Sequence, residues 1–91
     1  MDFIHNTNEI SLCNEEKDIV AYVKFPEVAQ GIVNVTTTFV SNELQGQGVA
    51  GKLMKELVND LRKTDRKAIP TCTYTRNWFS KHPEYNDLLV K

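Results

Sequence analysis

The stretch TFVSNELQGQGVAGKL, residues 38–53, decides how this chain folds. It begins as a β-rich run, passes through three glycines within six residues, and opens the long amphipathic helix of the sequence. Glycine lets the backbone approach a ligand closely, and the first turn of a helix leaves several N–H groups without intrahelical partners. Because these groups and the helix dipole attract anions, the stretch predicts a phosphate-binding turn.

The segment GQGVAGKL, residues 46–53, nearly matches the P-loop of nucleotide triphosphatases. That loop requires a Ser or Thr hydroxyl for magnesium at the position held here by Leu53. Leu53 also belongs to the apolar series of the following helix, so we expect it to face the core. The sequence therefore argues against a nucleotide triphosphatase.

The spacing Gly46-x-Gly48-x-x-Gly51 also fits the dinucleotide-binding pattern. That pattern calls for an acidic residue about twenty positions later, at the end of the next strand. The next apolar run, residues 68–74, contains no carboxylate. The chain is also too short for a doubly wound sheet, so this alternative is disfavoured as well.

Length and composition narrow the class of protein. A chain of 91 residues predicts one domain, residues 1–91. The net charge of −1 and the lack of a basic face argue against nucleic acid as a partner. With no membrane-spanning run and no signal pattern, the expected location is cytoplasmic. Cys13 and Cys72 lie far apart in the sequence, and no CxxC or Cys/His spacing typical of zinc ligands occurs. We therefore expect free thiols and no metal site.

The first half of the chain reads as three antiparallel strands. Residues 3–14 contain a polar break at residues 6–8 and then a short alternating run, which favours a first strand. Residues 19–25 are rich in β-branched and aromatic side chains and predict the second strand of a hairpin. After a loop, the long β-branched run of residues 32–40 predicts the third strand.

The second half predicts a helix packed on this sheet and then a parallel strand. The helix should run from about Gln47 to Thr64, since apolar residues recur there at helical spacing. A fourth strand, Ala68 to Tyr74, should follow by a right-handed crossover. Pro70 makes that strand short, bulged or an edge strand. Residues 76–81 read as a short helix, and residues 84–90 as either a short helix or a strand.

A third pattern, Gln45-x-x-Gly48-x-Ala50, resembles the pyrophosphate-binding signature of the GNAT superfamily of N-acetyltransferases. The predicted order of elements is similar to the GNAT core over most of residues 8 to 90. Two further runs, CTYTRNW (residues 72–78) and KHPEY (residues 81–85), together with residues 46–53, resemble the compact, roughly ninety-residue GNAT-like subfamily. The resemblance implies an α+β fold with a GNAT-like core: three antiparallel strands, pyrophosphate loop, long helix, parallel fourth strand and short C-terminal helix.

The resemblance also implies acetyl-CoA or coenzyme A as the ligand. The loop would receive the pyrophosphate, and residues 36–40 would pair with the pantetheine amides. The implied ligand-binding residues are Phe39, Val40, Gln45, Gly46, Gln47, Gly48, Val49, Ala50, Gly51, Arg76 and Asn77. Cys72 would lie near the thioester, where it could accept the acetyl group as a thiolate, line the acyl pocket, or be an inert buried thiol.

Direct transfer of acetyl to an amine also requires an acid and a base. Tyr74 or Tyr85 could protonate the departing sulfur, although core packing is an alternative role for each. No carboxylate lies between Ile32 and Val40, which leaves Glu43 and His82 as weaker candidates for the base.

The resemblance implies an acyltransferase acting on an amine, with a protein or another macromolecule as one candidate acceptor. A second class is a non-catalytic acyl-CoA sensor or carrier, in which Cys72 could be acetylated. A third class is an interaction module that keeps the fold without the ligand; it predicts a damaged loop, whereas this loop is intact. For the loop itself, the alternative to ligand binding is a tight strand-to-helix turn in which the glycines serve only geometry. The acceptor, the base and the oligomeric state are not predicted.

Overall fold

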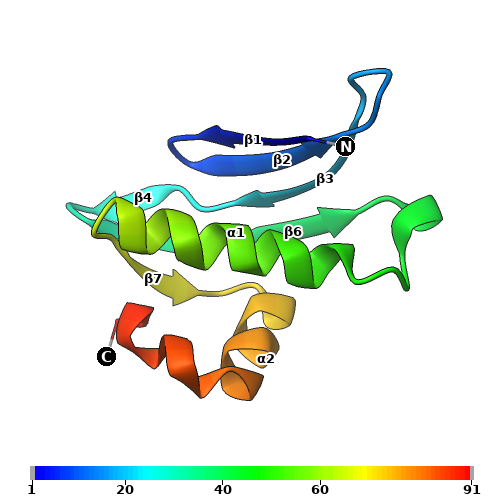
Figure 1. Ribbon diagram of the computed structural model, residues 1–91. Helices are drawn as coiled ribbons and strands as arrows, with labels where there is room; N and C mark the ends of the chain where they lie inside the picture. The colour runs from blue at the N-terminus through cyan, green and yellow to red at the C-terminus, as the bar shows by residue number, and fades with distance from the viewer. Residues whose placement is uncertain (1, 91) are drawn as a thin grey trace.

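The computed structural model describes residues 2–90, which form two β-sheets, two α-helices and two 3₁₀ helices (Figure 1). In chain order the elements are β1 (Asp2–Asn6), β2 (Glu9–Cys13), β3 (Ile19–Lys24), β4 (Glu27–Ala29), β5 (Ile32–Val35), β6 (Thr37–Val40), η1 (Asn42–Leu44), α1 (Val49–Lys63), β7 (Lys67–Pro70), α2 (Thr73–Lys81) and η2 (Pro83–Leu88). Among these residues no helix has the length and hydropathy needed to cross a membrane.

The strands divide into two sheets. One is antiparallel, in the order β1-β2-β3-β6, and the other has the order β4-β5-β7. In the second sheet β5 runs antiparallel to β4 and parallel to β7. β5 lies in the predicted third strand before α1 and β7 follows α1, so this parallel pair confirms the predicted strand–helix–strand unit. The α+β class and the order of the GNAT-like core are also confirmed.

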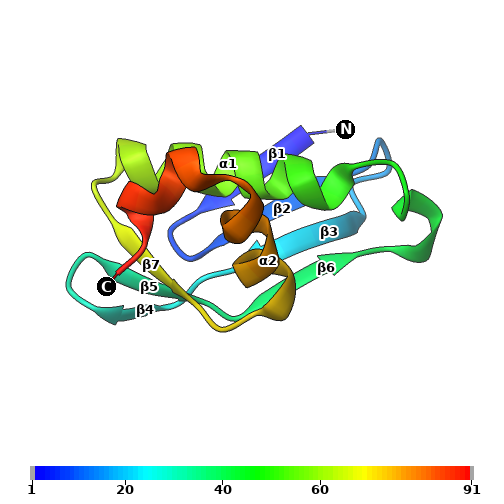
Figure 2. The same cartoon turned by 90° about the horizontal axis from the view of Figure 1, so that it is seen from below.

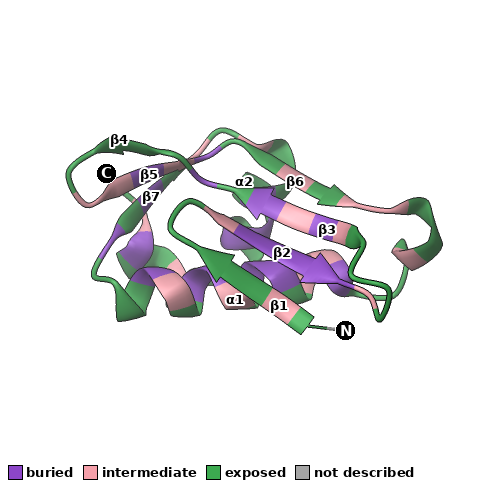
Figure 3. Cartoon of the chain, turned by 90° about the horizontal axis from the view of Figure 1, so that it is seen from above, coloured by how far each residue is buried: buried purple, intermediate pink, exposed green. Residues whose placement is uncertain are grey.

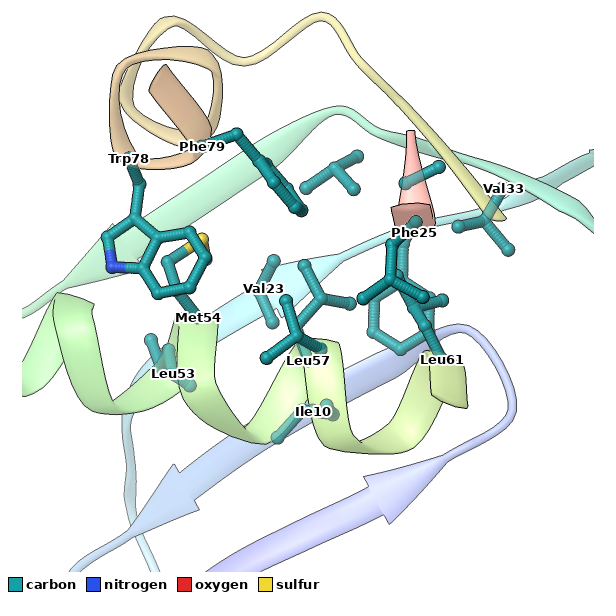
Figure 4. Close-up of a cluster of buried hydrophobic side chains, with 14 of the residues drawn as sticks. Ile10, Val23, Phe25, Val33, Leu53, Met54, Leu57, Leu61, Trp78 and Phe79 are labelled. Carbon is teal, nitrogen blue, oxygen red and sulfur yellow. The ribbon is translucent and has the colours of Figure 1, made fainter. Parts of the chain in front are cut away.

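The apolar face of α1 forms the centre of the core (Figure 4). Its fully buried residues are Leu53, Met54, Leu57, Val58 and Leu61. They pack with buried side chains of the sheets and of α2, among them Ile10, Val23, Phe25, Val33, Trp78 and Phe79. Burying one such side chain fully contributes about 1.5–3 kcal/mol, so this stripe holds the helix on the sheets.

The N-terminal region holds one strand more than the sequence predicted. Residues before the polar turn pair as well, so β1 and β2 form a hairpin and the antiparallel sheet has four strands. Figure 3 shows most of β1 exposed and most of β2 buried. The predicted loop after β3 likewise contains a short strand, β4. Residues 84–90 combine both predicted alternatives, since η2 is followed by a bridge from Leu89 to Ala68.

The predicted third strand, residues 32–40, is divided at Thr36 between the two sheets. Before Thr36 the strand pairs with β4 and β7, and after it the chain pairs with β3. The Thr36 N–H donates to the carbonyl oxygen of Lys24 at 3.0 Å, which directs the chain toward β3. Figure 2 shows β6 diverging from β7, with α2 beside it.

The predicted fourth strand, Ala68 to Tyr74, is wrong after Pro70. Pro70 ends the strand at the edge of its sheet, because proline has no N–H to continue a ladder. The N–H groups of Thr71 and Cys72 then both donate to the carbonyl oxygen of Val35, at 3.1 and 3.0 Å. Cys72 is the N-cap of α2, so Cys72 and Tyr74 belong to a helix start.

Candidate functional site

The turn between β6 and α1 presents unpaired backbone N–H groups. Gly46 and Gly48 have φ of 82° and 76°, a conformation that favours glycine. Gly48 is the N-cap of α1 and has no side-chain cap. The first intrahelical bond runs from the Lys52 N–H to the Gly48 carbonyl at 3.1 Å. The preceding N–H groups of the helix therefore point outward, where an anion can accept from them.

Open space lies beside this turn. A Cβ added at Gly46, Gly48 or Gly51 would meet no atom within 4 Å. A hollow of about 160 Å³ is lined by Val40, Leu44, Gln45, Gly46, Gly48, Val49, Ala50, Gly51 and Tyr74. Gly51 is helical, so its backbone does not require glycine, but the absence of its side chain keeps the hollow open. The residues present therefore fit a bound diphosphate.

Gln45 connects the turn to the end of β6. Its side-chain amide donates to the carbonyl oxygen of Val40 at 3.2 Å and to Oδ1 of Asn42 at 3.3 Å. β6 is the last strand of its sheet, and the Ser41 N–H donates to Val20 on β3 at 2.8 Å. Because alternate residues of an antiparallel edge strand direct their backbone groups to opposite sides, the N–H of Val40 points away from β3.

Cys72 lies between β6 and the first turn of α2. Its half-buried thiol donates to Oγ1 of Thr38 at 3.7 Å. Burial raises the pKa of the Cys72 thiol, but the N–H groups of Thr75 and Tyr74 and the hydroxyls of Thr38 and Thr75 lower it. The net effect is a pKa below the ordinary value, which favours the nucleophilic thiolate.

Tyr74 forms the opposite wall of the hollow from the glycine turn. Its side chain is 40% exposed and also borders a second hollow, of about 210 Å³, beside Asn77, Trp78 and Lys81. Burial raises the pKa of Tyr74 above its ordinary value, so the phenol keeps its proton at neutral pH. A protonated phenol beside the hollow can act as a proton donor.

The structure does not bring every residue implied by the sequence to this hollow. Phe39 is 43% exposed and stacks on Tyr22 of β3 at 5.2 Å, on the side of the sheet away from the core. The amide of Gln47 donates to the carbonyl of Glu43 at 3.0 Å. Arg76 and Asn77 lie on α2, outside the residues that line the glycine hollow, as does Cys72.

The alternative acid and base candidates lie elsewhere as well. Nδ1 of His82 is 2.7 Å from the carbonyl oxygen of Trp78, and the two rings stack at 4.0 Å. His82 therefore satisfies a carbonyl at the end of α2. Tyr85 stacks on the same Trp78 ring at 5.4 Å, while Arg62 lies 4.8 Å from the ring of Tyr85. Tyr85 therefore packs between α2 and α1, while His82 packs on α2.

A family model for GCN5-related N-acetyltransferases matches residues 9–88. The chain belongs to this family. A search of curated proteins finds no significant match. The family assignment covers every element from β2 to η2, including the glycine turn and both walls of the hollow.

Solved structures show the same fold for this family member. The solution structure of a GCN5-like protein from Staphylococcus aureus is 28% identical, with a TM-score of 0.79, over 98% of this chain and 87% of that one. Tetrahymena GCN5 is 14% identical, with a TM-score of 0.68, over 91% of this chain and 59% of that one. A GNAT family N-acetyltransferase from Escherichia coli, solved with CoA, is 20% identical, with a TM-score of 0.65, over 77% of this chain and 44% of that one.

Two threonines that the sequence did not single out lie beside Cys72. Oγ1 of Thr38 on β6 lies 3.3 Å from Oγ1 of Thr75 on α2, and Thr75 is fully buried. The alternation of polar residues in the third predicted strand could have marked Thr38, but no local signal paired it with Thr75.

A larger hollow lies at the other end of the molecule. Its volume is about 800 Å³, and it is lined by residues of the β4–β5 turn, β7 and the C-terminal segment. It is a wide opening whose lining carries charges of both signs, from Asp65, Lys67 and Asp87, and includes none of the glycines of the turn between β6 and α1. The glycine hollow is smaller, yet it is the one that suits a phosphate-bearing ligand.

Proposed function

We propose that this protein binds acetyl-CoA between the glycine turn, the free edge of β6 and the start of α2, and transfers the acetyl group to an amine. The observation that carries the proposal is the turn itself. Its uncapped helix N-terminus and its side-chain-free glycines at positions 46, 48 and 51 suit a diphosphate. Membership of the family and the CoA bound to the Escherichia coli protein support the choice of ligand.

The residues around the hollow have distinct roles in this proposal. The turn holds the diphosphate, and the outward N–H of Val40 donates to the thioester carbonyl, where charge develops during transfer. Tyr74, which keeps its proton at neutral pH, gives that proton to the departing sulfur. Of the other residues implied by the sequence, Arg76 and Asn77 on α2 are proposed contacts to the pantetheine arm or the phosphates.

A second route is favoured by the lowered pKa of Cys72. In this route the Cys72 thiolate attacks the thioester carbonyl, a bond forms between Sγ and the acetyl carbon, and the bond to the CoA sulfur breaks. The CoA thiolate leaves and takes the proton of Tyr74. An acceptor amine then removes the acetyl group, or the protein keeps it as a non-catalytic carrier.

For the acceptor of the acetyl group we propose only a chemical class. We propose an amine on a protein or another macromolecule, because the sequence lacks the paired helices that enclose the acceptor in larger GNAT enzymes. A cytoplasmic location is also proposed, supported by the composition and by two cysteines that both remain free thiols in the structure.

The test is a titration of the isotopically labelled protein with acetyl-CoA, followed by backbone amide shifts and then by intact mass. We expect shifts centred on residues 45–51 and on the start of α2. A mass increase of one acetyl group on Cys72 would support the covalent route, while shifts without added mass would favour direct transfer. The absence of shifts at the turn would overturn the proposed ligand. Titration with CoA, which carries no acetyl group, is the control for the mass change.

A further inference from the structure

The two sheets part at a defined point, between Thr36 on one chain segment and Thr71 on the other. Up to this point β5 and β7 are paired as parallel strands. The carbonyl oxygen of Val35 then accepts two hydrogen bonds, one from the N–H of Thr71 at 3.1 Å and one from the N–H of Cys72 at 3.0 Å. Beyond Val35, β6 joins β3 while the other segment enters α2. Cys72 therefore sits where the two segments diverge, which we term the fork.

Side chains join the two arms of the fork beyond the last backbone hydrogen bonds. Thr38 on β6 contacts Thr75 on α2, with 3.3 Å between the two Oγ1 atoms. The same Thr38 hydroxyl accepts from Cys72 Sγ at 3.7 Å. Thr75 has no exposed surface, so its hydroxyl depends on partners inside the protein. The three side chains form a chain of hydrogen bonds that runs from the half-buried thiol into the core.

A hydroxyl can both donate and accept, so this chain can reverse its direction. With a protonated thiol, Sγ donates to Thr38, and Thr38 can donate to Thr75. With a thiolate, Thr75 can donate to Thr38 while Thr38 donates to the negative sulfur. An aliphatic side chain of the same shape would pack equally well but could make neither arrangement.

We propose that Thr38 and Thr75 are positioning residues, which hold the sulfur of Cys72 in the fork and donate to it when it becomes a thiolate. This role of the two threonines rests on the covalent route of the proposed function. The direction of the pKa shift of Cys72 agrees: burial raises the pKa, while the Thr75 N–H and then the Thr38 and Thr75 hydroxyls lower it. The two threonines act through Cys72 and need no contact with the ligand.

The experiment measures the pH dependence of alkylation of Cys72 by iodoacetamide, without acetyl-CoA. Peptide mass mapping distinguishes Cys72 from the buried Cys13. Thr38→Val keeps the shape and removes the hydroxyl, and we expect it to raise the alkylation midpoint by about one pH unit. Thr75→Val should also raise it, because it removes the hydroxyl that hydrogen-bonds Thr38 and helps to lower the pKa of Cys72.

Two further variants separate hydrogen bonding from packing. Thr38→Ser retains the hydroxyl and should return the midpoint close to that of the unaltered protein. Thr37→Val removes the hydroxyl of the neighbouring exposed residue, which donates to Thr36, and should leave the midpoint unchanged. An unchanged midpoint in folded Thr38→Val and Thr75→Val, or a shift in Thr38→Val that Thr38→Ser does not reverse, would overturn the proposal.

The unaltered protein provides a second measurement if the valine variants do not fold. The Cβ chemical shifts of Thr38 and Thr75 should change with pH at the midpoint recorded for Cys72, because the hydrogen bonds reverse when the thiol ionises. Threonine shifts that stay constant through that titration would overturn the inference. Since no step uses acetyl-CoA, a protein that fails to bind this ligand but shows the linked titration would overturn the proposed function alone.

Discussion

The side-chain amide of Gln45 donates to the carbonyl oxygen of Val40 across 3.2 Å and so fixes the glycine turn to the last residue of β6. The same amide reaches Asn42 at 3.3 Å. The position of the outward helix N–H groups relative to the free edge of β6 therefore depends on one exposed side chain. If the ligand spans both, the Gln45 amide sets the geometry of its site.

Gln45→Leu should weaken binding of acetyl-CoA about tenfold, since it removes hydrogen bonds that together contribute on the order of 1–2 kcal/mol to the position of the turn. The free energy of unfolding should fall by no more than about 1–2 kcal/mol, because the side chain is exposed and only these hydrogen bonds are lost. Calorimetric titration measures the affinity. Gln30→Leu, an exposed glutamine in the β4–β5 turn, is the matched control. Equal affinities of the two variants would contradict the prediction.

Gly51 permits a test in which stability and binding should change in opposite directions. Gly51→Ala should raise the free energy of unfolding by about 0.5–1 kcal/mol, since glycine is costly inside a helix and the added Cβ meets nothing. Gly51→Glu should also stabilise the helix, because a carboxylate in the first turn complements the dipole. Its bulk and charge should nevertheless reduce acetyl-CoA affinity by at least roughly tenfold.

Gly51→Gln adds nearly the same bulk without the charge, so its affinity should fall between those of the alanine and glutamate variants. Denaturant unfolding and calorimetric titration of all three variants provide the comparison. A glutamate variant that binds acetyl-CoA as tightly as the unaltered protein would exclude the first turn of α1 as the phosphate site.

Tyr74→Phe should slow the release of CoA from acetyl-CoA by about tenfold to a hundredfold, because it removes the proposed proton donor. The affinity for acetyl-CoA should change little, since the ring remains. Released CoA is measured chromatographically at saturating acetyl-CoA, with Cys72 or a peptide panel as acceptor. Tyr22→Phe, on the opposite side of the sheet beside Phe39, is the control. A normal rate in Tyr74→Phe would assign the proton to water.

Arg66→Met should lower the free energy of unfolding by about 2–3 kcal/mol. Arg66 is only 9% exposed, pairs with Asp60 at 3.0 Å and donates to the carbonyl of Thr7 at 2.9 Å. The change leaves a largely buried carboxylate and a carbonyl without that partner. Lys63→Met, on the exposed face of α1, is the control for losing a charge. A similar effect of both variants in denaturant unfolding would show that the buried contacts contribute little.

The pair Arg62–Asp87 predicts a pH-dependent contribution to stability. A hydrogen bond from Arg62, 2.9 Å long, holds the pKa of the Asp87 carboxyl below its usual value. A lowered folded-state pKa stabilises the protein above the ordinary aspartate pKa of about 3.9, and this contribution is lost as pH falls through the folded-state value.

Arg62→Met should therefore be less stable than the unaltered protein at neutral pH, and the difference should narrow below about pH 4. The carboxyl shift of Asp87, followed by NMR, should titrate at higher pH in the variant. Because both side chains are largely exposed, salt should reduce the difference. A difference in stability that stays constant down to acid pH would assign the effect of Arg62 to its packing on Tyr85.

The elements with strong local signals could be predicted from the sequence. The helix predicted from Gln47 to Thr64 is observed as α1, Val49–Lys63. Its apolar residues recur at a spacing that places them on one face of a helix with 3.6 residues per turn. Gly46 and Gly48 marked the turn because its backbone adopts positive φ. Pro70 marked the end of an edge strand, since proline cannot continue a ladder. The pattern at residues 45–50 indicated the family.

Contacts between distant segments were decided only by the tertiary structure. The β-branched run of residues 32–40 predicts one strand. In the structure it is divided at Thr36, because residues up to Val35 pair with β7 and the Thr36 N–H donates to Lys24 instead. Pro70 and the hydrogen bonds from Thr71 and Cys72 to Val35 place Cys72 at a helix N-terminus instead of in a strand. The pairing of β6 with β3 stacks the Phe39 ring on Tyr22. Thr38 and Thr75 are 37 positions apart in the chain, and only the folding of the two sheets around α1 brings their hydroxyls together. The sequence by itself determined which local structures form and which turn is proposed to bind an anion, because both depend on neighbouring residues. The surroundings of the thiol depend on hydrogen bonds across the fork, which no local pattern encodes.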